Sequence, residues 1–263
     1  MKYKLADDVR PQAKLLAIAT VLTVAIWFIP YAEYAVYPIR LFVTFIHESS
    51  HALVALLTGG SVKSLTIAAD GSGVVYSASS SLIGTLFTSS AGYIGTTVFG
   101  VILLYLMRRN VASQKVLFSI GALLGVITLV FGVIFPFFNF LSLDVGFSSV
   151  AFTVGVGIGL SVGLMALALY GNPKIANFAI AFLAIQCLTN ALSDLKTLFF
   201  INAPLVGVDN IQSDAGNMAA ATGVPAIVWT GVWILISVGV IALGFRMYMA
   251  ARSASPTDSV FVD

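Results

Sequence analysis

The stretch FIHESSHAL, residues 45–53, contains the only two histidines of the chain, four residues apart within an apolar run. Four residues are about one helical turn, so both imidazoles project from one face of a helix and can hold one metal ion. Glu48 follows the first histidine and can reach water on that ion. The pattern H-E-x-x-H is typical of a helical zinc site in which the glutamate is the general base.

The composition indicates that this motif lies in a membrane protein. Of the 263 residues, 59% are hydrophobic and 9% are charged, whereas about 25% of an average soluble domain is charged. We therefore expect an integral, multi-pass membrane protein. The net charge is only +2, and the cations stand near the ends of apolar runs, so nothing in the sequence indicates a nucleic-acid partner.

Seven apolar runs follow one another, and nearly all have the ~20 residues needed to cross a bilayer. After the second run, residues 61–80 contain strand-forming residues on both sides of the turn DGSG (70–73), which predicts a β-hairpin. The fold class is therefore an all-α polytopic membrane protein, with about six to seven transmembrane helices and a short membrane-associated hairpin after the histidine helix. Residues 1–252 would form one membrane-embedded domain, and residues 253–263 a disordered polar tail. The apolar runs are residues 15–36, 41–57, 81–107, 116–140, 145–170, 175–200 and 226–249.

The positions of the lysines and arginines predict the orientation of the chain, because these residues favour the cytoplasmic side of a membrane. If the cations at 108–115, 174 and 246–252 are cytoplasmic, the last five helices alternate correctly and the C-terminus lies inside. The N-terminal cations at 2–14 favour the same side. Both ends can lie inside only if one early element does not cross. The histidine helix with its hairpin is the expected re-entrant or half-buried element.

The third metal ligand has to come from elsewhere in the chain, because a catalytic zinc ion usually has three protein ligands and one open position. With no third histidine, it must be a carboxylate or, less favourably, the single cysteine, Cys187. Asp194 stands out because it lies inside an apolar run, where a charge costs about 2.5–3.5 kcal/mol. We predict that His47, His51 and Asp194 hold one zinc ion. Asn190, one turn before Asp194, is the predicted substrate-binding residue.

The histidine stretch, extended to FIHESSHALVALLTGGSV (45–62), resembles the signature of the M50 family of membrane metallopeptidases, the site-2 protease clan, and especially its M50B-type branch. The likeness continues through DGSG (70–73), SAGYIG (90–95), NALSD (190–194) and SDA (213–215).

This resemblance implies a zinc-dependent peptidase that cuts membrane-protein or peptide substrates within or near the membrane. Glu48 would be the catalytic acid and base, and Asp194 the third ligand. In many members the ligand aspartate stands in Leu-Asp-Gly, whereas here the sequence is LSDL (192–195). Asp214 is therefore the reserve candidate for the third ligand.

Two other classes of function are compatible with these features. A non-proteolytic membrane scaffold or chaperone could keep the motif without using it, but the intact Glu48 argues against this, since such a protein needs no general base. A metal-binding transporter is compatible with seven helices. However, only one region of the chain offers metal ligands, and no internal repeat is visible. An intramembrane zinc metalloprotease is the favoured interpretation.

Overall fold

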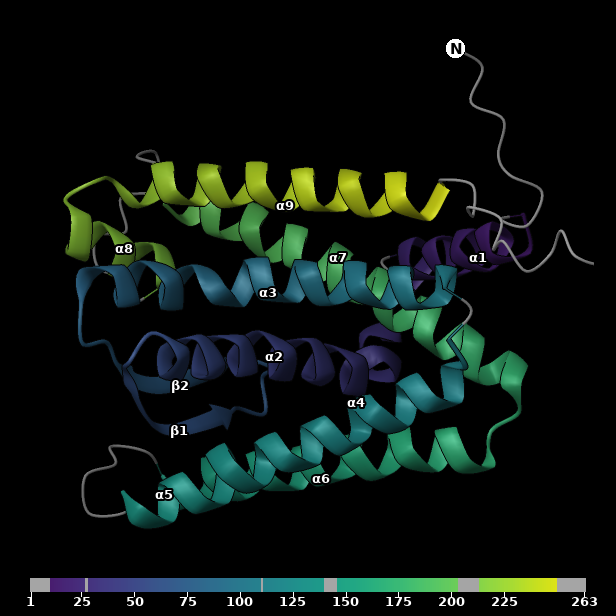
Figure 1. The fold of residues 1–263 in the computed structure, drawn as a ribbon, viewed down its shortest axis with the longest axis horizontal. Coiled ribbons are helices and arrows are strands. Elements are labelled where there is room, and N and C mark those ends of the chain that lie inside the picture. Colours follow the sequence, from purple (N-terminus) through teal and green to yellow (C-terminus); the bar gives the residue numbers. More distant parts are fainter. Residues whose placement is uncertain (1–9, 27, 110, 140–145, 203–212, 250–263) are drawn as a thin grey trace, which may run out of the picture.

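The computed structural model (Figure 1) describes residues 10–26, 28–109, 111–139, 146–202 and 213–249, so the predicted tail lies outside the described residues. Five segments of this part are long and apolar enough to cross a membrane. They are α3 (Leu82–Arg108), Ser113–Phe138, α6 (Phe147–Tyr170), α7 (Pro173–Ile201) and α9 (Ala226–Met249); the second comprises α4 (Ser113–Ile127), a π-helical segment (Thr128–Ile134) and α5 (Phe135–Phe138). The predicted all-α polytopic fold is confirmed.

The N-terminal helices differ in their boundaries from the predicted runs. α1 (Arg10–Ile26) is short, and α2 (Ala32–Leu57) begins well before the histidine run and continues through it. Pro30 accounts for the break between them, because proline has no N–H group and disfavours helical backbone in the residue before it. Tyr31 then adopts a left-handed conformation with φ of 63°. Pro38, by contrast, lies within α2.

The predicted hairpin is present as two antiparallel strands, β1 (Ser61–Ile67) and β2 (Gly73–Ala78). The turn between them contains Gly71 with φ of 85°, a conformation that favours glycine. Within the turn, the carboxylate of Asp70 accepts hydrogen bonds from the backbone N and the hydroxyl of Ser72, at 2.9 and 2.6 Å. These bonds lower the pKa of Asp70 below its usual value.

One strand of the hairpin is anchored to the helices around it. β1 packs against α2, the π-helical segment and α6. The backbone N of Ile67, at the end of β1, donates to the hydroxyl of Thr153 on α6 at 2.7 Å. Thr153 is fully buried. Residues of β2, in contrast, line a cavity beside α2, so the hairpin has one covered strand and one strand at an open space.

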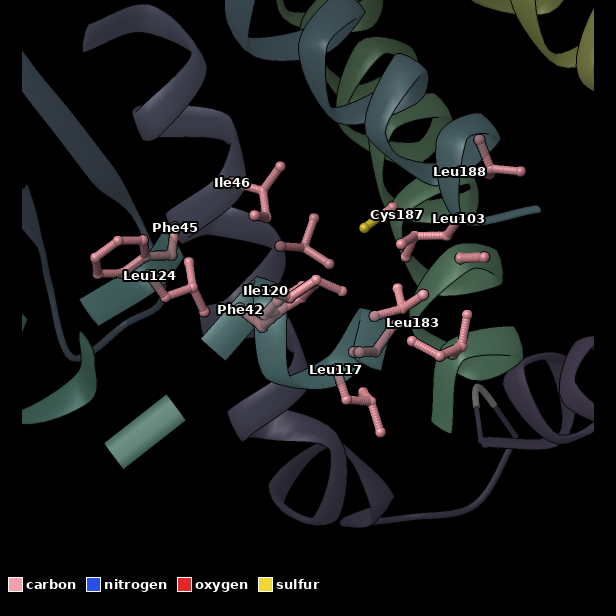
Figure 2. Close-up of a cluster of buried hydrophobic side chains, with 14 of the residues drawn as sticks. Phe42, Phe45, Ile46, Leu103, Leu117, Ile120, Leu124, Leu183, Cys187 and Leu188 are labelled. Atoms are coloured by element: carbon pink, nitrogen blue, oxygen red, sulfur yellow. The ribbon is translucent and has the colours of Figure 1, made fainter. Parts of the chain in front are cut away.

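The main hydrophobic core lies where α2, α3, α4 and α7 meet (Figure 2). Phe42 and Phe45 of α2, Leu103 of α3 and Leu124 of α4 are almost completely buried there. The single cysteine, Cys187, is buried in the same core on α7. This packing holds the histidine helix between α3 on one side and α4 on the other.

A short helix, α8 (Asp214–Thr222), forms in the polar stretch before the last span, where the sequence predicted none. The Ser213 hydroxyl caps its start by accepting from the backbone N of Gly216 at 3.1 Å, and Gly223 ends it with φ of 71°. α8 contacts α3 and α9. Its first residue is thereby brought close to the histidine helix.

Candidate metal centre

The two histidines project from one face of α2, as their spacing predicts. Their Nε2 atoms are 3.0 Å apart, and the ring planes are inclined by 68°. His51 is buried, and His47 is partly exposed to the cavity. The two Nε2 atoms therefore face the same small space at the wall of the cavity, which we call the meeting point.

A backbone group on the neighbouring helix fixes the ring of His51. The Nδ1 of His51 donates to the carbonyl oxygen of Thr88, on α3, at 2.6 Å. A carbonyl oxygen can only accept, so Nδ1 carries a proton, and in the neutral form of the ring the lone pair of Nε2 points at the meeting point. Such a hydrogen bond is the usual way in which a protein orients a metal-binding imidazole.

The ring of His47 is held by aromatic packing. It lies edge-on to Tyr93 of α3, with ring centroids 4.7 Å apart. Tyr93 stacks in turn on Trp233 of α9, whose indole N donates to the hydroxyl of Ser90 at 2.9 Å. Three helices therefore position this imidazole.

Gly92 lets α3 approach the two imidazoles closely. A Cβ at this position would overlap the Nε2 atoms of both His47 and His51. Glycine is therefore required here to leave room at the meeting point. The sequence SAGYIG (90–95) pointed to this part of α3, but sequence reasoning gave no role to Gly92, Thr88 or Tyr93.

Asp214 brings a carboxylate to the same point from the first residue of α8. Its Oδ2 is 3.3 Å from the Nε2 of His51 and 3.7 Å from the Nε2 of His47. Burial acts to raise the pKa of Asp214, but the two imidazoles lower it more, so this pKa is well below its usual range. Asp214 is therefore held as a carboxylate beside the histidines.

These three side chains fit the requirements of a zinc ion. Two imidazoles and one carboxylate are a common ligand set in catalytic zinc sites. Ligand atoms at ~2.0–2.1 Å from a tetrahedral ion lie about 3.4 Å from one another. The three separations here are 3.0, 3.3 and 3.7 Å. Among the described residues, His47, His51 and Asp214 form the group able to share one ion.

Glu48 is buried at the wall of the same cavity, next to both histidines. The start of β2 closes over it, because a Cβ on Gly73 would lie 2.7 Å from the Glu48 Oε1. A carboxylate therefore lies beside the two histidines at the wall of the cavity. The hairpin is in direct contact with it.

Asp194 and Asn190 line the same cavity from α7. Asp194 does not belong to the group of ligand atoms that could share one ion with the histidines. Asn190 donates from Nδ2 to the carbonyl oxygen of Gln186 at 2.8 Å and to its side-chain oxygen at 3.0 Å. The structure thus brings every predicted site residue to one cavity, but it places the reserve candidate Asp214 beside the histidines.

The cavity has a volume of about 1040 Å³, which is large enough for a short peptide segment. Its walls come from α2, β2, the first part of α3, the later part of α7 and α8. Many of the lining groups are hydroxyls, amides and charges, so the cavity can hold water at the depth of apolar helices. Hydrolysis requires such water.

A family model described as Peptidase M50B-like matches residues 16–244, most of the chain. The matched region includes α2, the hairpin, α3, α7 and α8, and with them every residue of the candidate centre. No curated protein and no solved structure matches the chain.

Proposed function

The chain belongs to the Peptidase M50B-like family, and from this membership we propose that it is a zinc-dependent metalloprotease that hydrolyses peptide bonds of membrane-protein substrates. The main observation in support of the proposal is that the Nε2 atoms of His47 and His51 and the Oδ2 atom of Asp214 lie 3.0–3.7 Å from one another. The five spans support a substrate that lies in the bilayer.

His47, His51 and Asp214 would hold the ion. When bound, zinc supplies Lewis acidity, which polarises the scissile carbonyl and makes water nucleophilic near neutral pH. Asp194, the third ligand predicted from the sequence, is replaced in this proposal by Asp214. Its place on the cavity wall supports contact with the substrate instead.

Glu48 would act as the general base and then as the general acid. Its carboxylate accepts a proton from the water whose oxygen attacks the scissile carbonyl carbon. As the C–N bond breaks, the protonated Glu48 gives this proton to the leaving nitrogen, so the products are a carboxylic acid and an amine. The remaining acid proton then passes to the amine, which gives a carboxylate and an ammonium group. The contact between Glu48 and the Gly73 backbone region supports this role, because it fixes the side chain at the cavity wall.

The open strand of the hairpin offers a way to hold an extended substrate. A helical substrate hides its carbonyl groups in hydrogen bonds and must unwind before cleavage. β2 lines the cavity from Gly73 to Ser77, whereas β1 is tied to α6 through Ile67 and Thr153. An unwound segment could therefore pair with β2 as an added strand. Asn190, across the cavity, would contact the same segment.

The test compares the wild-type protein with Glu48→Gln in detergent or proteoliposomes, using metal analysis and cleavage of membrane-protein reporters. We expect one zinc ion per chain in both proteins and cleavage only by the wild type. Glutamine keeps the shape of the side chain but cannot accept the proton. A wild-type protein without stoichiometric zinc, or a Glu48→Gln variant with undiminished cleavage, would falsify the proposal. Metal flux into the proteoliposomes would instead indicate a transporter.

A further inference from the structure

Cationic side chains mark the ends of several spanning helices. α3 ends at Arg108, and Arg109 follows it. Lys115 lies in the first turn of α4, and Lys174 is the second residue of α7. Arg246 lies in the last turn of α9.

Contacts between the helices show that these cations lie at one end of the bundle. The side-chain N of Gln114, at the start of α4, donates to the carbonyl oxygen of Gly171, just before α7, at 2.9 Å. Gly244, near the end of α9, packs against Val101, in the last third of α3. Figure 1 shows the ends of α3 and α9 on the same side of the molecule. The starts of α4 and α7 follow the ends of α3 and α6, so all five cations share this end.

The candidate centre lies toward the opposite end. At 1.5 Å per residue, Gly92 is about 15 Å from the first residue of α3 and about 24 Å from the last. From the imidazoles the cavity continues to Thr85 in the first turn of α3, to Ser79 after the hairpin and to Ala220 in α8. Figure 1 shows α8 and the start of α3 on the side away from the cationic ends. The cavity therefore opens away from the five cations.

The opening end carries fewer cations in the described part of the chain. Lys63 of β1 and Lys196 near the end of α7 lie there, and Arg40 lines the cavity from within α2. Lysine and arginine in short loops and at helix ends favour the cytoplasmic side of a membrane.

We propose that the cavity opens on the non-cytoplasmic side of the membrane, with the cationic end in the cytoplasm. If the proposed proteolytic function holds, the substrates are membrane proteins whose scissile segment lies in the non-cytoplasmic half of the bilayer. The unwound segment would enter between β2 and α8 from that side.

The orientation can be tested with single cysteines in the full-length chain. Cys187 is the only native cysteine and is buried, so Cys187→Ala provides a background without thiols. On this background, Ala220→Cys and Ser79→Cys place a thiol at the opening of the cavity, and Ala112→Cys places one at the cationic end. All three positions are exposed. Each variant is treated in intact cells, and again after lysis, with a membrane-impermeant maleimide.

We expect the two opening positions to react in intact cells and Ala112→Cys to react only after lysis. The reverse pattern, or equal labelling of both ends in intact cells, overturns the proposal. So does protection of both opening positions in intact cells when the same thiols react after lysis. Labelling needs no catalysis, so an inactive chain with the expected pattern would refute the proteolytic function but not the orientation.

A second experiment tests the proposed substrate class by cleavage of reporter proteins. Two single-span reporters carry the same cleavable segment, one in the non-cytoplasmic half of the span and one in the cytoplasmic half. We expect the wild-type protein to cut the first reporter and Glu48→Gln to cut neither. Preferential cleavage of the second reporter would overturn the proposed substrate class, even though it would support the peptidase activity itself.

Discussion

Asp194 and Asp214 reach the same cavity from two different kinds of segment. Asp194 belongs to α7, an apolar spanning helix of 29 residues. Asp214 is the first residue of α8, a helix of nine residues that is not among the candidate spans. Yet the carboxylate of Asp214 lies 3.3 Å from the Nε2 of His51. A carboxylate within an apolar helix indicates a cavity that holds water. Its place along the helix does not show which carboxylate lies beside the histidines.

The start of the short helix α8 fixes the position of Asp214. Ser213 caps α8 and fixes the position of the residue that follows it. A residue in the first turn of a helix can present its carboxylate close to the axis, where the helix dipole favours a negative charge. Asp194, on the side of a long helix, faces the cavity together with Asn190 one turn away. α8 thus positions the carboxylate that lies beside the histidines, whereas α7 forms part of the cavity wall.

The largest expected effect is a difference in zinc affinity between the variants Asp214→Ala and Asp194→Ala. We expect Asp214→Ala to lower the zinc affinity by more than ~100-fold, because even residues that only support ligands change it by 10–100-fold. Peptidase activity would be lost with the zinc. Asp194→Ala should keep one zinc ion per chain, as measured by metal analysis after dialysis. Loss of zinc from Asp194→Ala but not from Asp214→Ala would reverse the comparison.

Gly92→Ala tests whether zinc binding needs the space that Gly92 of α3 leaves beside the two imidazoles. The added methyl group would overlap the Nε2 atoms of both histidines, so we expect zinc affinity to fall by roughly 100-fold, an effect as large as removing a residue that supports the ligands. Stability should not fall in parallel, because alanine is favoured over glycine in a helix by about 0.5–1 kcal/mol. Metal titration and thermal unfolding separate the two effects.

The matched control is Gly155→Ala on α6, where a Cβ would meet no atom within 4 Å. This variant should bind zinc as the wild type does. Equal zinc binding by Gly92→Ala and Gly155→Ala would show that the ion does not lie between the imidazoles and α3.

Local patterns in the sequence predicted the parts of the centre that lie within one element. His47, Glu48 and His51 follow from helical spacing alone, and the hairpin follows from DGSG (70–73) between strand-forming residues. The helix boundary at Pro30 could also be read locally, since proline is the usual cause of such a break. These features depend on neighbours in the chain, which the sequence displays directly.

The position of Asp214, the proposed third ligand, could not be predicted in this way. Asp214 reaches the histidines only because α8 packs on α3 and α9, and the contact with α3 joins segments more than 100 residues apart. The sequence SDA (213–215) does contain a capping serine before an acidic residue, a signal for a helix start. Recognising that signal would have predicted α8, but not its position beside the histidines.

Ser213→Ala tests how far the cap of α8 positions the ligand. Loss of a serine cap costs about 1 kcal/mol, which corresponds to about a fivefold change in an equilibrium constant. We expect the zinc affinity to fall by about this factor, because the first turn of α8 carries Asp214. Ser81→Ala removes the corresponding cap of α3, whose hydroxyl accepts from Gly84 at 3.0 Å. It should lower stability and leave zinc affinity nearly unchanged; equal losses of affinity would assign the effect to general destabilisation.

Asn190→Ala tests the cavity wall formed by α7 and has the smallest expected effect. Both described hydrogen bonds of this amide are made by its Nδ2, so its oxygen can accept an N–H of the substrate. One such hydrogen bond contributes about 0.5–1.5 kcal/mol, and we expect KM to rise about threefold while kcat and zinc content stay unchanged. Thr189→Ala is the control, because its hydroxyl donates to the Ile185 carbonyl within α7. A fall in kcat for Asn190→Ala with constant KM would place Asn190 in the chemical step, and the distinction drawn here between the two helices would then fail.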